Sequence, residues 1–198
     1  MSAELWQQLQ RTTPLEVAAV VLGLAYVLLI VRRNRWGWFA GAASSSIYVY
    51  LAARARLPMQ SLLQAYYVAM AVYGWLQWTR NAGEQGGRIV RLALRWHLHA
   101  VLLILIASAL TARWLAAETQ AAWPWLDSLT TWTCLWATWL VARSVLENWL
   151  YWIAADAVSV FLFAQQSLPF TAGLFTAYLL IASWGYRTWL LRYRRQMH

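Results

Sequence analysis

The sequence contains no lysine, because all 16 of its basic residues are arginines, and it has only one cysteine, Cys134. The absence of lysine excludes a retinal protein, since retinal attaches through a lysine Schiff base. A single cysteine excludes a disulfide framework and a thiolate metal cluster, so Cys134 is expected to be a small core residue.

Motifs for chemistry are also missing. The sequence has no G-x-x-x-x-G-K-[ST] phosphate loop, which argues against an ATP-driven pump. Asp156 has no second carboxylate or histidine at its depth, so an intramembrane enzyme is not expected. His97 and His99 point in different directions on a helix, which makes a shared metal site improbable. The sequence therefore predicts no catalytic residue, no metal and no cofactor.

Apolar residues dominate what is present. Hydrophobic residues make up 62% of the 198 positions, 16 residues are tryptophan, and only 12% are charged. This is a membrane composition, and each apolar stretch approaches the ~20 residues that cross a bilayer core. Since backbone groups in lipid must bond within their own segment, we predict an all-α integral membrane protein. The seven predicted spans are 14–31, 36–53, 58–78, 96–113, 125–142, 147–164 and 170–189.

The arginines are distributed unevenly between the loops. With seven spans, twelve fall on one side of the membrane and four on the other, which predicts an external N-terminus and a cytoplasmic C-terminus. Because they sit at helix ends, nucleic-acid binding is not expected. The four external ones are Arg11, Arg54, Arg56 and Arg113. The twelve cytoplasmic ones are Arg32, Arg33, Arg35, Arg80, Arg88, Arg91, Arg95, Arg143, Arg187, Arg192, Arg194 and Arg195.

An internal repeat relates the two halves of the chain. A shift of about 111 positions superposes spans two and three on spans six and seven without a gap. The most informative identical pairs are Trp38/Trp149, Pro58/Pro169, Tyr67/Tyr178, Gly74/Gly185 and Trp78/Trp189. The predicted architecture is therefore 3+1+3, with parallel three-helix repeats at 14–78 and 125–189 joined by a linker and connecting helix at 79–113. Such repeats are typical of transporters that bind substrate near the midplane at the repeat interface.

One helix face carries most of the candidate site. Trp149, Trp152, Asp156 and Ser159 lie at i, i+3, i+7 and i+10 and so share a face. A carboxylate at membrane depth costs roughly 2.5 to 3.5 kcal/mol on insertion scales, so Asp156 should face protein, water or a ligand. An indole attracts a desolvated cation by ~2 kcal/mol, which suits a flat and cationic ligand. The predicted substrate-binding residues are Trp152, Asp156, Trp149, Asn148, Gln64, Tyr67, Tyr48, Ser45, Trp132, Trp136, Thr131 and Tyr178.

Structural roles remain open for the same residues. Asp156 could be a carboxylate satisfied by neighbouring helices, and Trp149 could belong to an interfacial aromatic belt. The stripe containing Trp132 and Trp136 is more often a helix-packing surface, and Gln64 and Tyr67 could equally form hydrogen bonds between helices. A membrane scaffold without transport would leave the Asp156 face packed and without a cavity.

Three features of the sequence together resemble the PnuC family of bacterial vitamin transporters. They are the run Glu147-Asn148-Trp149-Leu150-Tyr151-Trp152, the Leu62-Leu63-Gln64 segment with Tyr73-Gly74-Trp75 and Trp78, and the 3+1+3 repeat. The resemblance covers about 14–190. It implies an inner-membrane carrier with an external N-terminus, which moves an unphosphorylated B vitamin by facilitated diffusion.

The resemblance also bears on the substrate. Where carriers of nicotinamide riboside look richer in amides, this chain has Ser45, Asp156 and Trp184. A fixed negative charge beside indoles suits thiamine, whose thiazolium is permanently cationic. Nicotinamide riboside is cationic too and stays the alternative. The expected partners are therefore a small vitamin, the lipid bilayer and, as an open possibility, further copies of the chain.

Overall fold

A computed structural model describes residues 13–54, 58–80, 87–118, 123–165 and 169–197 of the chain. Within these ranges the regular structure is helical, apart from one isolated β-bridge. The helices of the described part are α2 (Pro14–Val31), α3 (Gly37–Arg54), α4 (Pro58–Arg80), α5 (Leu94–Glu118), α6 (Pro124–Ala142), α7 (Asn148–Gln165) and α8 (Pro169–Arg195). The all-α prediction is confirmed, and each predicted span corresponds to one helix.

The composition of the helices fits a bilayer. Two of them, α2 and α5, reach mean hydropathies of 2.4 and 2.0 and are long and apolar enough to cross a membrane. The other five have 18 to 27 residues, and their many tryptophans and tyrosines lower the hydropathy without adding charge. Large apolar side chains also face outward, such as Leu103 and Leu110 of α5, which are 65% and 66% exposed. Lipid is the environment in which such side chains are stable.

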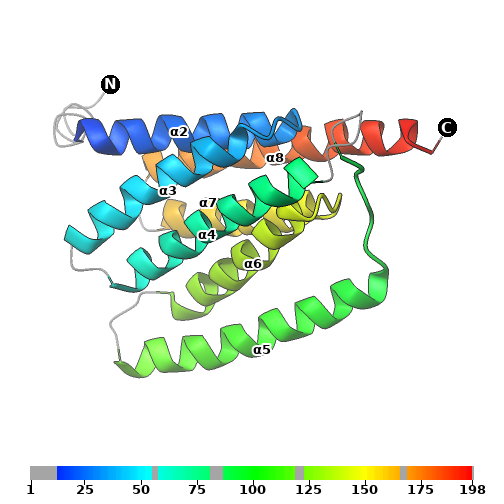
Figure 1. Cartoon of the computed structure of the whole chain (residues 1–198). Helices are drawn as coiled ribbons and strands as arrows, with labels where there is room; N and C mark the ends of the chain where they lie inside the picture. Colours follow the sequence, from blue (N-terminus) through cyan, green and yellow to red (C-terminus); the bar gives the residue numbers. More distant parts are fainter. Residues whose placement is uncertain (1–12, 55–57, 81–86, 119–122, 166–168, 198) are drawn as a thin grey trace. The chain divides into compact units, whose positions relative to one another are not determined.

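The chain divides into two compact units, Met1–Ala82 and Gly83–His198. In the first unit α3 packs against both α2 and α4. In the second, α7 packs against both α6 and α8, and α5 packs against α6 (Figure 1). The same packing order in both units matches the sequence repeat. The narrower division into 14–78, 79–113 and 125–189 stays a prediction, since α5 clusters with the second unit.

The first helix of each repeat ends in the same backbone motif. Arg33 and Ser144 are equivalent positions, and both adopt positive φ, 61° and 58°. The next amide bonds back five residues, from Asn34 to the carbonyl of Leu29 at 2.9 Å and from Val145 to that of Leu140 at 3.0 Å. This is a Schellman ending, which usually has glycine at the left-handed position. The chain adopts it twice without glycine.

A tryptophan packed on a glycine joins the second and third helices of each repeat. A Cβ atom at Gly74 would lie 2.4 Å from the ring of Trp38, and one at Gly185 would lie 2.7 Å from the ring of Trp149. A second indole closes each contact edge to face, Trp78 on Trp38 at 5.4 Å and Trp189 on Trp149 at 5.5 Å. The glycine pair of the sequence repeat is therefore closely packed in both units. We call these two contacts the tryptophan locks.

Replacing Gly185 by alanine should destabilise the protein. The added methyl group overlaps the Trp149 ring, and overpacking of a well-packed site typically costs ~1 to 3 kcal/mol. Gly173 of the same helix is the matched control, because a Cβ there meets nothing within 4 Å and alanine favours a helix over glycine. Thermal unfolding in detergent should show a lower Tm for Gly185→Ala and an unchanged or higher Tm for Gly173→Ala. Equal Tm values for both variants would contradict the lock.

Candidate functional site

The predicted face of α7 is buried. Asn148, Trp149, Asp156 and Ser159 are buried, and Trp152 is half-buried. Their helical spacing places them on one side, as predicted, while Leu150 and Ala157 between them are exposed. The face thus points into the protein rather than toward lipid.

Asp156 is the charged residue of this face. It is 6% exposed, and among the described residues its carboxylate makes neither a hydrogen bond nor an ion pair. The Cys134 side chain of α6 interacts with it electrostatically. Cys134 therefore lies near the Asp156 side of α7. A buried carboxylate without a cation is energetically costly, and it can accept hydrogen bonds or balance the charge of a ligand.

Two more polar groups lie at the start of α7. Asn148 is completely buried; its amide donates to the carbonyl of Val145 at 2.6 Å, whereas Oδ1 has no hydrogen-bond partner among the described residues. The indole N–H of Trp149 also lacks a partner there. However, the Trp149 ring is held in its tryptophan lock on α8. This placement favours a packing role for Trp149. The side-chain carbonyl of Asn148, in contrast, is an acceptor without a partner among the described residues.

The two predicted tryptophans of α6, Trp132 and Trp136, make different contacts. The indole of Trp132 donates to Thr111 of α5 at 3.1 Å. Trp136 stacks on Trp139 with centroids 4.9 Å apart, and Thr131 is half-buried. The bond to Thr111 favours a helix-packing role for Trp132 between α5 and α6, which the sequence left open.

The remaining predicted residues are half-buried in their own units. Tyr178 of α8 contacts Phe175, with centroids 6.1 Å apart. In the first unit Tyr67 contacts Tyr66 at 5.8 Å. The other three predicted residues of that unit are Ser45, Tyr48 and Gln64. A shared cavity between these residues and the α7 face stays a prediction.

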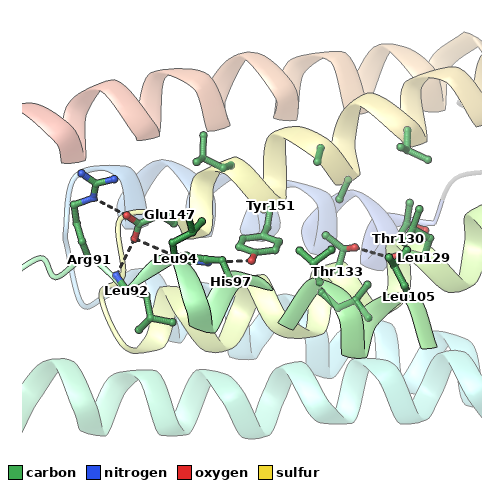
Figure 2. Close-up of a pocket in the computed structure, with 16 residues that line it drawn as sticks. Arg91, Leu92, Leu94, His97, Leu105, Leu129, Thr130, Thr133, Glu147 and Tyr151 are labelled. Atoms are coloured by element: carbon green, nitrogen blue, oxygen red, sulfur yellow. Dashed lines mark hydrogen bonds and ion pairs between the residues drawn. The ribbon is translucent and has the colours of Figure 1, made fainter. Parts of the chain in front are cut away.

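A cavity of about 590 Å³ lies within the second unit, between α5, α6 and α7. None of the predicted substrate-binding residues lines it. Arg91, His97, Glu147 and Tyr151 gather at one end, while Leu105, Leu129, Thr130 and Thr133 lie toward the other (Figure 2). The cavity is therefore a feature separate from the Asp156 face.

Glu147 organises the polar end of this cavity. Its buried carboxylate accepts hydrogen bonds from Nε of Arg91 at 2.7 Å and from the backbone amide of Leu92 at 3.3 Å. His97 Nε2 lies 3.9 Å from the same carboxylate, and His97 Nδ1 is hydrogen-bonded to the Tyr151 hydroxyl at 3.0 Å (Figure 2). The hydrogen bond and charge of Glu147 raise the pKa of Arg91 above its ordinary value. We call these four side chains the Glu147 cluster.

The Glu147 cluster ties the segment before α5 to the α6–α7 turn. Val90 forms the β-bridge with Val145: its amide donates to Ser144 at 3.0 Å, and its carbonyl accepts from Leu146 at 2.9 Å. The amide of Ile89 donates to the side chain of Gln196 at 3.2 Å. Segment 87–93 is thus held against the second repeat by backbone and side-chain bonds.

Sequence reasoning missed this cluster because its members are far apart in the chain. Glu147 and Arg91 are separated by 56 positions, and no motif joins them. The available signal was an acidic residue at the start of a span beside a basic loop. His97, for which the sequence suggested no partner, bonds to Tyr151. No group of three or more histidine, cysteine, aspartate or glutamate residues that could hold a metal occurs in the described ranges.

The chain is similar to a family of known transporters. A family model described as nicotinamide mononucleotide transporter matches residues 13–191. The riboflavin/roseoflavin transporter RibM of Streptomyces davaonensis is 28% identical over 179 residues, covering 88% of this chain and 84% of RibM. The nicotinamide riboside transporter PnuC of Escherichia coli is 24% identical over 202 residues, covering 89% and 84%.

A solved structure agrees with the fold. The crystal structure of the vitamin B3 transporter PnuC superposes with a TM-score of 0.73 at 24% identity, covering 91% of this chain and 82% of that one. The family match shows a transporter rather than an enzyme, and the seven described helices in repeated units fit that class. The chain belongs to the nicotinamide mononucleotide transporter family, that is, the PnuC family, as its motifs predicted.

Loss of the Glu147 charge should loosen segment 87–93. Glu147→Gln keeps the shape but weakens bonds from a guanidinium and an amide, and each bond to a charged group contributes ~1.5 to 3 kcal/mol. Hydrogen exchange should show faster exchange of the Val90 and Leu92 amides. Glu118→Gln, at an exposed acid at the end of α5, is the control and should leave both unchanged. Unchanged protection in Glu147→Gln would show that the β-bridge alone holds the segment.

Proposed function

We propose that the protein carries an unphosphorylated B vitamin with a cationic ring across the bacterial inner membrane, and that thiamine is the substrate. The observation that carries the proposal is the buried Asp156 carboxylate, which no described residue neutralises. Family membership supports a vitamin-type cargo, because the relatives are named for riboflavin and nicotinamide riboside. A neutral cargo would leave the charge of Asp156 without a function.

Thiamine suits the groups on this face. Its thiazolium is a permanent cation that can stack on an indole, and Trp152 lies one helical turn before Asp156. Its aminopyrimidine can donate a charge-assisted hydrogen bond to a carboxylate. The unpartnered Oδ1 of Asn148 adds a second acceptor on the same face. Trp152, Asp156 and Asn148 are therefore the proposed core of the site, with Gln64, Tyr67, Tyr48 and Ser45 expected from the first repeat.

Nicotinamide riboside is the second candidate, and the comparisons favour it. The relative from Escherichia coli is named for nicotinamide riboside, and the solved neighbour for vitamin B3. The pyridinium ring of nicotinamide riboside is also cationic, so this vitamin satisfies the charge argument equally well. The two vitamins differ in the donor that each offers to Asp156, which is an aminopyrimidine in thiamine and a carboxamide or ribose hydroxyl in nicotinamide riboside.

The proposed transport mode is facilitated diffusion by alternating access. Rigid three-helix repeats that rock against each other are a general design for such carriers, and the tryptophan locks hold the second and third helices of each repeat together. The excess of arginine on one side, twelve against four, favours a cytoplasmic C-terminus and an external N-terminus.

Replacing Asp156 by asparagine should reveal the charge of the substrate. The change keeps the shape and removes the charge, so thiamine binding should weaken by ~1 to 3 kcal/mol, or about 5- to 150-fold. Trp152→Ala should weaken it similarly by removing the stacking face. Isothermal titration of the purified protein with thiamine, nicotinamide riboside and riboflavin measures these changes, and neutral riboflavin should be almost indifferent to Asp156→Asn.

The matched control is Asp127→Asn, which removes a carboxylate from the exposed first turn of α6. It should leave every affinity unchanged. Tighter binding of nicotinamide riboside than of thiamine by the unmodified protein would replace thiamine by the second candidate. Unchanged affinity of both vitamins in Asp156→Asn would remove Asp156 from the site.

The substrate gradient alone should drive transport, because the sequence has no nucleotide-binding loop. Proteoliposomes loaded with unlabelled thiamine should exchange it for labelled thiamine, and uptake into empty vesicles should stop at equal concentrations. Vesicles without protein give the background. Accumulation above the external concentration, energised only by a proton gradient, would show coupled transport instead.

A further inference from the structure

The cavity between α5, α6 and α7 has two chemically different parts (Figure 2). The Glu147 cluster forms its polar end, near the start of α5. The rest of its wall is mainly apolar and includes Val101, Ile104, Leu105, Leu129, Ala154 and Val158. A molecule that fills the cavity must therefore join a polar group to a long apolar body.

Two threonines in the apolar part do not change its character. The Thr130 hydroxyl donates to the carbonyl of Leu126 at 2.9 Å, and that of Thr133 donates to the carbonyl of Leu129 at 2.7 Å. Both donors are thus used within α6, so they do not require a polar ligand.

The dimensions of the cavity fit one leaflet of a bilayer. Its α5 wall runs from Leu94 to Leu105, which corresponds to about 16 Å at 1.5 Å per residue and to about half of the ~30 Å hydrocarbon core. Val101 and Leu105 are 43% and 52% exposed. The cavity is therefore open to the side, where lipid chains lie.

The charges around the polar end favour an anion. Arg91 uses Nε for its bond to Glu147, yet its side chain stays 56% exposed. Arg88 and Arg95, three positions before it and four positions after it in the chain, are also exposed, although neither lines the cavity. The segment that carries Arg91 is therefore rich in guanidinium groups. Guanidinium groups bind phosphate oxygens in a two-pronged geometry.

We propose that this cavity binds an anionic phospholipid, with its phosphate on Arg91 and one acyl chain along α5 between α6 and α7. On the orientation proposed above, the arginines lie at the cytoplasmic surface, where basic pockets between membrane helices bind anionic headgroups. The bound lipid fixes α5 to the second repeat. The site is separate from the Asp156 face, so its occupancy does not depend on which vitamin is carried.

Native mass spectrometry of the full chain, released from nanodiscs of phosphatidylglycerol and phosphatidylcholine in equal amounts, tests the site. The unmodified protein should retain phosphatidylglycerol in preference. Arg91→Gln should reduce that retention about five-fold or more. Arg113→Gln is the matched control, because Arg113 is an exposed arginine at the other end of α5 and does not line the cavity. It should retain the lipid fully.

Ala154→Phe decides the result if Arg91→Gln does not fold. It leaves every arginine in place and fills the apolar part of the cavity, so it should lose the retained lipid while still binding vitamin. Equal retention of both lipids, equal loss in Arg113→Gln, or full retention in Ala154→Phe would each overturn the proposal. A changed oligomeric mass at an unchanged lipid count would assign the cavity to contact between copies. Loss of vitamin binding with lipid retained would assign it to the vitamin.

Discussion

The contact of a tryptophan ring with a glycine backbone is the interaction on which each repeat depends. Without a hydrophobic driving force between helices in lipid, close packing must hold them together. Gly74 and Gly185 allow the indoles of Trp38 and Trp149 to approach within a distance that any Cβ would prevent. In the first repeat the guanidinium of Arg33 also lies 4.3 Å from the Trp78 ring, so the left-handed residue and the lock support each other.

Close packing within the second repeat holds the buried polar face in place. Asp156 and the carbonyl of Asn148 lie on the same helix as Trp149, and the lock on α8 fixes the rotation of that helix. Groups held in place before binding lose less entropy when a ligand arrives. The two repeats share this scaffold but not their chemistry: where α7 has Asp156, the equivalent position of α3 is Ser45. The two repeats thus have the same helix packing, and the negative charge occurs at this position only in the second.

The second unit contains a further arrangement that the first does not show in its described residues. Segment 87–93 reaches the α6–α7 turn through Val90 and the Glu147 cluster, and α5 follows directly from it. The connecting helix is therefore fastened to the second repeat at its beginning. Farther along it packs on α6, and a lateral cavity lies between α5, α6 and α7. A membrane lipid bound in that cavity would fill the space between α5, α6 and α7.

The sequence by itself determined the helices, their repeat and their family. Long apolar segments in lipid must be helical, and identical Trp, Gly, Pro and Tyr residues at a constant shift indicate a repeat. The inward side of α7 also followed from helical spacing. Tertiary structure alone decided the rest. It placed Trp149 in a lock and bonded Trp132 to Thr111, and it brought Arg91 and His97 to Glu147 across 56 and 50 positions. Spacing along one helix fixes which residues share a face, whereas contacts between distant segments depend on how the helices pack, which no local pattern records.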